Sequence, residues 1–229
     1  IFLFSYTIHI MKIEKYLLSK ILNTIPIMSS YEILNVKNIY DEIAHEFNKT
    51  RGYYWKPITD FIDNLENNSL IYDIGCGNGR NMTYNNHSFI GVDNCQKFID
   101  ICHSKGLDAI CNNMMNIELP DNSADSILCI AAFHHLDCRQ NRINSLNELK
   151  RLIKPQGDIL LTIWSKNQPS KTRVKFENYG DNIVYWKNKY PRYYYIFSLD
   201  EIQNLFNIVG LIVKSHIYDC GNEVFRLSK

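Results

Sequence analysis

Short apolar segments alternate with segments of helical periodicity along most of this chain. Within residues 35–48, for example, Val36, Tyr40 and Ile43 recur at the three- and four-residue spacing of one helix face. Residues 125–130 are apolar almost throughout, as in a strand that is covered on both faces. The same pattern predicts strands at 70–74, 88–93, 107–111, 125–130, 159–164, 211–218 and 223–227 and helices at 35–48, 57–66, 95–105, 140–153 and 199–209.

This order of strands and helices predicts an α/β fold, a doubly wound sheet that is mostly parallel with an antiparallel last strand. Residues 165–197 break the rhythm because they are polar, aromatic and long, so we expect an insertion or lid there. We predict that residues 1–34 are an N-terminal extension, untranslated or disordered, because the chain begins with isoleucine and Met11 and Met28 offer later starts. The folded domain is predicted at 35–229.

Composition and charge narrow the class of protein. A chain of 229 residues and 26.9 kDa, 45% of them hydrophobic, can bury the core of one large domain. The formal net charge of +1 excludes a general polycation, so any contact with nucleic acid must come from a local patch. The seven cysteines include no Cys-x-x-Cys pair, which indicates a reduced, cytoplasmic protein, with the nucleus as a further location. No apolar run reaches the length of a membrane span, so we expect no membrane contact.

A glycine-rich turn follows the first predicted strand and carries most of the chemical information. Residues 73–79 read Asp-Ile-Gly-Cys-Gly-Asn-Gly, and Asp93 ends the next strand. A strand, a glycine-rich turn and an acid at the end of the second strand form the layout of a nucleoside site. The spacing Gly-x-Gly-x-Gly differs from that of dinucleotide enzymes and points to S-adenosylmethionine. The alternative is a glycine-rich turn without a ligand.

Each part of this cofactor has a candidate partner. The amides of the turn and of a helix after it are expected to hold the methionine carboxylate. Asp93 is expected to bind the ribose hydroxyls, with a helix cap as the alternative. Asn113 is expected near the adenine amine, with a turn asparagine as the alternative, and Asp73 near the loop amides or the methionine amine. The predicted cofactor residues are Asp73, Gly75, Cys76, Gly77, Asn78, Gly79, Asp93, Asn94, Asn113, Ile130 and Ala131.

A second group of candidates lies where the fourth and fifth strands end. His134 and His135 follow residues 125–130, and ligands bind outside the carboxyl ends of parallel strands, so both would face the transferred methyl group. The alternative is that the pair only makes a loop polar. Trp164 ends the next strand and is either a packing residue or a wall that stacks on a flat substrate. A metal cluster of the two histidines with Cys138 lacks an evident fourth ligand, so we predict no metal.

The predicted insertion is unlike the rest of the chain in charge. Seven basic and two acidic residues lie between Lys166 and Arg192. Tyrosines and Trp186 are interleaved with them. Basic residues can neutralise phosphates while aromatic rings stack on unpaired bases, so this segment is a candidate RNA contact. The alternative is a solvated loop whose tyrosines pack on the sheet.

Several motifs together resemble one family. They are Tyr40-Asp41-Glu42-Ile43-Ala44, Thr50-Arg51, Trp55-x-Pro57, Asp73 to Arg80, Gly91 to Asn94, Ile130 to Leu136, Lys154 to Trp164 and Arg192-Tyr193-Tyr194. Over about residues 35–225 the chain resembles the eukaryotic tRNA wobble-uridine 5-carboxymethyl methyltransferases. These include the yeast enzyme and the methyltransferase domain of the human AlkB-homologue fusion.

The resemblance implies a Rossmann-like class I methyltransferase fold and a specific reaction. The family uses S-adenosyl-L-methionine to esterify the carboxylate of 5-carboxymethyluridine in the tRNA anticodon loop, together with a small zinc-containing activator protein. By resemblance, the substrate side is lined by Arg51, His134, His135, Trp164, Arg192 and Tyr193.

The chain departs from the family pattern at a few positions. Asn113 stands where the family has an aspartate, and Tyr195 replaces a histidine. Gln156 replaces a glycine, and Gly221-Asn222-Glu223 lacks a following tryptophan. Two other functions therefore remain as alternatives. One is a methyltransferase for a small metabolite, and the other is a non-catalytic scaffold that binds S-adenosylmethionine.

Overall fold

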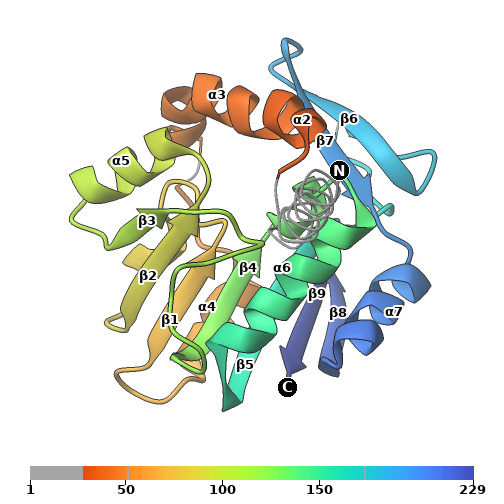
Figure 1. Cartoon of the computed structure of the whole chain (residues 1–229). Coiled ribbons are helices and arrows are strands. Elements are labelled where there is room, and N and C mark those ends of the chain that lie inside the picture. Colours follow the sequence, from red (N-terminus) through yellow and green to blue (C-terminus); the bar gives the residue numbers. More distant parts are fainter. Residues whose placement is uncertain (1–27, 51, 173) are drawn as a thin grey trace, which may run out of the picture.

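The computed structural model describes residues 28–50, 52–172 and 174–229. A seven-stranded sheet forms its centre, and helices lie on both faces and along one edge (Figure 1). The strands of this sheet are β1 Leu70–Ile74, β2 Ser88–Asp93, β3 Ala109–Cys111, β4 Ala124–Ile130, β5 Ile153–Trp164, β8 Ile212–Asp219 and β9 Asn222–Ser228. The helices are α2 Ser30–Glu32, α3 Asn38–Asn48, α4 Lys56–Asp63, α5 Gln96–Ser104, α6 Arg139–Leu152 and α7 Leu199–Val209, with π-helix η1 Ile33–Lys37 and 3-10 turns η2 Asn81–Thr83 and η3 Phe133–His135.

The sheet has the order β3-β2-β1-β4-β5-β9-β8. The first five strands in this order are parallel, and β9 is antiparallel to both β5 and β8. The predicted doubly wound α/β sheet, mostly parallel with antiparallel pairing at its end, is therefore confirmed. The strand order reverses between the neighbouring strands β1 and β4. A ligand crevice is therefore expected beyond the carboxyl ends of these two strands.

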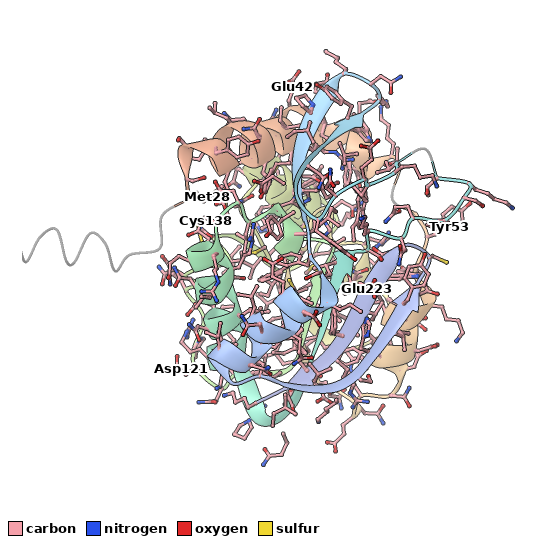
Figure 2. The ribbon with its side chains drawn as sticks, turned by 90° about the vertical axis from the view of Figure 1, so that its right-hand side faces the viewer. Met28, Glu42, Tyr53, Asp121, Cys138 and Glu223 are labelled. Atoms are coloured by element: carbon pink, nitrogen blue, oxygen red, sulfur yellow. The ribbon has the colours of Figure 1, made fainter. Side chains whose placement is uncertain are left out.

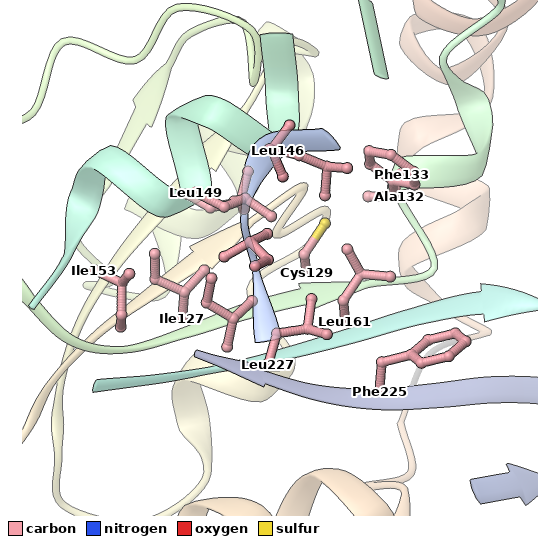
Figure 3. Packing of buried hydrophobic residues seen from close by; sticks show 14 of the residues in the cluster. Ile127, Cys129, Ala132, Phe133, Leu146, Leu149, Ile153, Leu161, Phe225 and Leu227 are labelled. Carbon is pink, nitrogen blue, oxygen red and sulfur yellow. The ribbon is translucent and has the colours of Figure 1, made fainter. Parts of the chain in front are cut away.

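The alternation of side chains along the strands divides the core into two layers. In β4, Ile127 and Cys129 pack with helices α6 and α7, whereas Leu128 points to the other face and packs with α4 and α5. Figure 3 shows the first layer, where Leu146 and Leu149 of α6 lie over β4 and its neighbours. Each such side chain stabilises the fold by about 1.5–3 kcal/mol when fully buried. The two layers hold the carboxyl ends of the strands in fixed positions.

The segment predicted as an insertion or lid contains regular structure of its own. Strands β6 Gly180–Trp186 and β7 Tyr190–Ile196 form a separate antiparallel hairpin. Lys187 and Asn188 at its tip both have positive φ, of 50° and 56°, which matches the twist of a tight hairpin turn. The hairpin lies beside α2 and α3 at one end of the molecule (Figures 1 and 2). It thus forms a wall above the strand ends.

Two further expectations differ from the structure. The packed domain begins before the predicted boundary at residue 35, because α2 already buries Glu32; residues 1–27 lie outside the described part. No α-helix follows the glycine-rich turn, where only the short turn η2 forms. Residues 80–87 are mostly polar, and Asn85 adopts a positive φ of 67°, so this segment has no apolar face to pack as a helix.

Candidate active site

A cavity of about 210 Å³ lies at the carboxyl ends of the parallel strands. Its floor comes from the ends of β1, β2, β4 and β5, through Gly75, Asp93, Ile130 and Trp164. Its roof is one face of the segment from α2 to α3, where lining side chains recur every four residues. These roof residues are Met28, Glu32, Val36 and Tyr40. The hairpin closes the remaining side with Arg192 and Tyr194.

The glycines of the turn have three different environments. Gly75 has a φ of +75°, and a Cβ there would lie 2.2 Å from the Cβ of Ala132. Gly79 has a φ of +72° and faces Leu107 and Cys102, so it does not line the cavity. Gly77 has a φ of +54°, lines the cavity and would place a Cβ within 4 Å of no other atom. Gly77 is therefore the position at which the backbone leaves room for a ligand.

The amides of this turn are largely committed to the protein itself. The N–H groups of Gly75 and Cys76 donate to the carbonyl of Val92, at 2.7 and 3.1 Å. The N–H of Gly77 donates to Asp93, and that of Gly79 donates to the carbonyl of Cys76. The prediction that these amides and a following helix hold a carboxylate is therefore not supported by the geometry. The turn instead fixes the position of Asp93.

Asp93 braces the turn and also lines the cavity. Its carboxylate accepts hydrogen bonds from the N–H groups of Gly77 and Cys95, both at 2.9 Å. Burial raises the pKa of Asp93 to about 6, against hydrogen bonds from the backbone of Cys95, Gly77 and Asn94. The bond to Cys95 lies at the start of α5, so the alternative of a helix cap is partly realised. Each oxygen has a second lone pair, with which it can bind a ligand hydroxyl.

The other predicted cofactor residues divide into two groups. Most of them line the cavity: Cys76, Asn78, Asn94, Asn113, Ile130 and Ala131. The side-chain oxygen of Asn113 accepts from the N–H of Met115 at 3.0 Å, which is the turn role named as its alternative. Asp73 is fully buried behind the cavity, where burial raises its pKa to about 7. The only hydrogen bond of its side chain among the described residues comes from Asn81, at 3.3 Å.

His134 is completely buried and is one of the residues that line the cavity. The main-chain N–H of Trp164 donates to its Nδ1 at 3.1 Å, so Nδ1 carries no proton and the neutral ring is protonated at Nε2. This Nε2 is buried and has no hydrogen-bond partner among the described residues. Burial, with His135 and Arg192 nearby, holds the pKa of His134 well below its usual range. The ring thus offers a single neutral N–H donor.

His135 is fixed at both nitrogens. Its Nδ1 lies 2.7 Å from the carbonyl oxygen of Tyr193, and its Nε2 lies 3.0 Å from the hydroxyl of Tyr40. Burial lowers the pKa of His135 to about 3, against the hydrogen bond to Tyr193. The ring is neutral and fully occupied, so it supports the wall of the cavity and is not available as a general base.

Arg192 is a buried cation beside the histidines, with 5% of its surface exposed. One terminal nitrogen donates to the hydroxyl of Tyr40 at 3.1 Å, and its Nε has no hydrogen-bond partner among the described residues. No carboxylate of the described chain forms an ion pair with it. The Tyr194 ring lies 5.2 Å from the guanidinium carbon and 4.9 Å from the ring of His134. Trp164 stacks on the same tyrosine at 4.4 Å.

Two predicted substrate residues are not part of this arrangement. Tyr193 points away from the cavity, because neighbouring side chains of β7 face opposite sides. Its hydroxyl donates to Asp181 at 2.6 Å, and only its carbonyl serves the site, through His135. Arg51 lies outside the described residues.

The residues that sequence reasoning missed come from the roof and from β7. Glu32 is buried at the cavity, where burial raises its pKa to about 7, and it accepts a hydrogen bond from the N–H of Asp137. Tyr40 is predicted as one position of a helix face and as part of a motif shared with the family, but with no role in the site. Tyr194 follows from Arg192 by strand alternation once Arg192 is known to point inward. The four-residue spacing in the sequence could have indicated that Glu32 and Tyr40 share a helix face, but not what that face covers.

Comparison with known proteins places the chain in a family. Residues 72–161 match the family described as a methyltransferase domain. A putative methyltransferase of Encephalitozoon cuniculi (strain GB-M1) is 30% identical over 196 residues, which cover 82% of this chain and 92% of that protein. The chain belongs to the methyltransferase family.

Among the residues that the structure describes, no helix is long and apolar enough to span a bilayer, and no group of three or more His, Cys, Asp or Glu side chains could hold a metal ion.

The methyltransferase is also similar to enzymes of the predicted subgroup. Mouse tRNA (carboxymethyluridine(34)-5-O)-methyltransferase ALKBH8 is 35% identical over 154 residues, covering 64% of this chain and 23% of the mouse protein. The Schizosaccharomyces pombe tRNA (carboxymethyluridine(34)-5-O)-methyltransferase is 29% identical over 218 residues, covering 84% of this chain and 95% of that protein. The predicted resemblance is confirmed. The chain spans about a quarter to a third of the length of the first relatives that it matches.

Solved structures agree on the fold of the methyltransferase. A Burkholderia thailandensis 1,6-didemethyltoxoflavin-N1-methyltransferase with bound S-adenosylhomocysteine matches with a TM-score of 0.66 at 15% identity, over 89% of this chain and 92% of that one. A putative methyltransferase in complex with the Haloferax volcanii Trm112 activator matches with a TM-score of 0.65 at 14% identity, over 84% and 96%. The class I methyltransferase fold is confirmed.

Proposed function

We propose that this protein is an S-adenosylmethionine-dependent methyltransferase that esterifies the carboxylate of 5-carboxymethyluridine at the wobble position of tRNA. One observation carries the choice of a carboxylate. The buried N–H groups at Nε2 of His134 and Nε of Arg192 have no acceptor among the described residues, and both side chains line the cavity against the Tyr194 ring. Buried donors need partners, and two of them, one belonging to a guanidinium, favour an anion.

The cavity fits the cofactor on grounds independent of the acceptor. Gly77 leaves the space that a Cβ would fill, and Asp93 lines the cavity with a carboxylate that can accept from a ribose hydroxyl. Asn112 and Asn113 supply amide groups at the end of β3, where an adenine amine would need them. S-adenosylmethionine would supply a methyl group on a sulfonium. The residues of the chain orient the acceptor and exclude water from it.

The protonation states of the site suit a carboxylate nucleophile. A carboxyl group with an ordinary pKa near ~4 is already ionised at pH 7, so the reaction needs no general base. Both histidines are neutral, and their lowered pKa values mean that neither attracts a proton. Arg192 and His134 can hold one carboxylate oxygen while the other attacks. Such positioning is worth on the order of 7–11 kcal/mol of the barrier.

The hairpin favours an RNA substrate over a free metabolite. The inner face of β7 lines the cavity, whereas the tip carries the exposed residues Lys187 and Lys189 beside the rings of Trp186 and Tyr190. Cations next to aromatic rings can bind the phosphates and unpaired bases of an anticodon loop. The names of the mouse and Schizosaccharomyces pombe relatives support tRNA as the substrate. The complex of a structural neighbour with an activator supports a small activator protein as a partner.

The decisive experiment measures the modified nucleoside. Purified protein, alone and with a candidate activator, is incubated with labelled cofactor and tRNA that carries 5-carboxymethyluridine, and the wobble nucleosides are analysed by mass spectrometry. We expect the methyl ester with carboxymethylated tRNA and no label with tRNA that has unmodified uridine. Equal methylation of the free nucleoside would favour a metabolite enzyme. Binding of S-adenosylhomocysteine without any transfer would favour a scaffold.

A further inference from the structure

Tyr40 joins three elements of the site through one oxygen atom. Its ring projects from α3 into the cavity wall, and its hydroxyl lies 3.0 Å from Nε2 of His135 and 3.1 Å from a terminal nitrogen of Arg192. His135 belongs to η3 after β4, and Arg192 belongs to the hairpin. The hydroxyl is thus the point at which the roof, the strand ends and the hairpin meet.

The direction of every proton in this chain of hydrogen bonds is determined. A carbonyl oxygen can only accept, so Nδ1 of His135 carries the proton that is donated to Tyr193. Nε2 of the neutral ring is then an acceptor, and the hydroxyl proton of Tyr40 must point to it. The lone pairs of the Tyr40 oxygen therefore face Arg192, which can only donate. His135 acts as the anchor that orients the hydroxyl.

Arg192 has an unusual set of partners for a buried cation. Buried guanidinium groups are generally paired with carboxylates, yet among the described residues this one is hydrogen-bonded to the side chains of Tyr40 and Tyr194 and lies near both of their rings. A carboxylate in place of the hydroxyl would fix the guanidinium equally well but would neutralise it. The neutral hydroxyl of Tyr40, together with Tyr194, fixes its direction and leaves its charge for a ligand.

We infer that Tyr40 is a positioning residue that aims Arg192 at the acceptor carboxylate while keeping the full positive charge of the guanidinium. The inference rests on the proposed function for the identity of the acceptor. It adds a residue whose role is exerted through Arg192 and His135 and not through contact with the reacting atoms.

Tyr40→Phe is a clean test because the ring is held independently of its hydroxyl. The ring contacts Phe47 edge-on at 5.5 Å and Phe98 at 6.1 Å. Phenylalanine keeps these contacts and removes only the two hydrogen bonds. Tyr72→Phe is the matched control, because Tyr72 is buried, donates to Ser123 at 2.9 Å and does not line the cavity.

The experiment is a double-mutant cycle on methyl transfer to carboxymethylated tRNA. We expect Tyr40→Phe to lower kcat/KM about tenfold, as for the loss of a hydrogen bond to a charged group, with the affinity for S-adenosylhomocysteine unchanged. In a protein that already carries Arg192→Lys, the same change should cost less than about twofold, because coupled residues are not additive. Tyr72→Phe should leave kcat/KM unchanged. Full additivity of Tyr40→Phe and Arg192→Lys would overturn the role of Tyr40.

A second measurement does not depend on the acceptor. NMR of the arginine side chains, in protein saturated with S-adenosylhomocysteine, reports rotation of the Arg192 guanidinium. We expect slow rotation in the wild type and in Tyr72→Phe, and faster rotation in Tyr40→Phe, where only the hydrogen bond to Tyr194 remains. If rotation changes as expected but the wild type transfers no methyl group to tRNA, the proposed function fails and the orienting contact stands. Unchanged rotation in Tyr40→Phe overturns the contact itself.

Discussion

The main-chain N–H of Trp164 donates a hydrogen bond to Nδ1 of His134 at 3.1 Å. This contact joins the carboxyl ends of β5 and β4, and it determines which nitrogen of the histidine carries a proton. The tautomer is thus set by the backbone of the sheet, which is held by two core layers. As a result, the N–H donor of the ring is Nε2, which is buried and has no hydrogen-bond partner among the described residues.

The first prediction concerns this donor. His134→Leu removes the N–H and should lower kcat/KM for methyl transfer to carboxymethylated tRNA by about 10- to 100-fold, the loss expected for a hydrogen bond to an anion. His134→Gln places an amide N–H near the position of Nε2 and should keep more activity than His134→Leu. Calorimetry should give an unchanged affinity for S-adenosylhomocysteine in both. Equal activity of the two variants would mean that the donor is not used.

The fold follows from the sequence far better than the site does. The predicted bounds of strands 70–74 and 88–93 match the structure because their apolar runs are bounded by turns and acids. The hairpin escapes prediction because polar residues and tyrosines obscure its alternation. Which side chains of β7 face the cavity depends on how the hairpin packs against α3 and η3. This packing decides whether Tyr193 or Tyr194 points inward. Local pattern cannot supply that information.

The roof and the glycine-rich turn show the same limit. Glu32 and Tyr40 share one face of a helical segment, but their spacing in the sequence does not show that this face covers a cavity. The motif alone suggests that the amides of the turn are available to a ligand. They are taken by Val92 and Asp93 because β2 lies beside β1 in a register that only the sheet defines.

The second prediction separates two glycines of the turn. Gly77→Ala has space for its methyl group and costs only the left-handed backbone, about 1–2 kcal/mol, so the protein should fold. That methyl group enters the cavity and should weaken binding of S-adenosylhomocysteine at least about tenfold. Gly75→Ala would place its Cβ 2.2 Å from Ala132 and should not yield folded protein. Tight binding by folded Gly77→Ala would show that the ligand lies elsewhere.

The third prediction concerns Asp93. Asp93→Asn replaces one acceptor oxygen by an NH2 donor. The N–H of either Gly77 or Cys95 then loses its acceptor, and a ribose hydroxyl loses its acceptor as well. Affinity for S-adenosylhomocysteine should fall about 10- to 100-fold in calorimetry. Asp125→Asn is the control, since Asp125 also accepts from a backbone N–H, that of Leu70 at 2.8 Å, but does not line the cavity. A similar loss in both variants would point to general destabilisation.

The fourth prediction concerns the tip of the hairpin. Combined Lys187→Ala and Lys189→Ala should weaken tRNA binding. The slope of the logarithm of affinity against the logarithm of salt concentration should decrease in magnitude by about 1 for each phosphate that the lysines no longer neutralise. Binding of S-adenosylhomocysteine should not change, because neither lysine lines the cavity. Lys154→Ala, which removes an exposed lysine paired with Asp125, serves as the control. An unchanged salt dependence would place the RNA on another surface.

The last prediction concerns pH and the buried Asp73. Burial raises its pKa to about 7 in the folded protein, whereas the unfolded chain has a pKa near ~3.9. The folded state therefore binds the proton more tightly, and the stability that this proton contributes is present below pH ~4 and is lost as the pH rises through about 7. Asp73→Asn remains neutral at every pH. Its free energy of unfolding in urea, relative to the wild type, should increase by about 2–3 kcal/mol between pH 5 and pH 8.

Glu32 and Asp93 also have raised pKa values, so the wild-type curve alone would not identify Asp73. The difference between wild type and Asp73→Asn cancels their contributions, because both proteins retain them. Asp121→Asn is the control, since its side chain is 66% exposed and it lies at the opposite end of the molecule from the hairpin (Figure 2). This variant should show the pH dependence of the wild type. A constant difference between wild type and Asp73→Asn across this range would mean that Asp73 is already ionised in the fold at pH 5, and that Asn81 and Arg80 stabilise its charge more than burial opposes it.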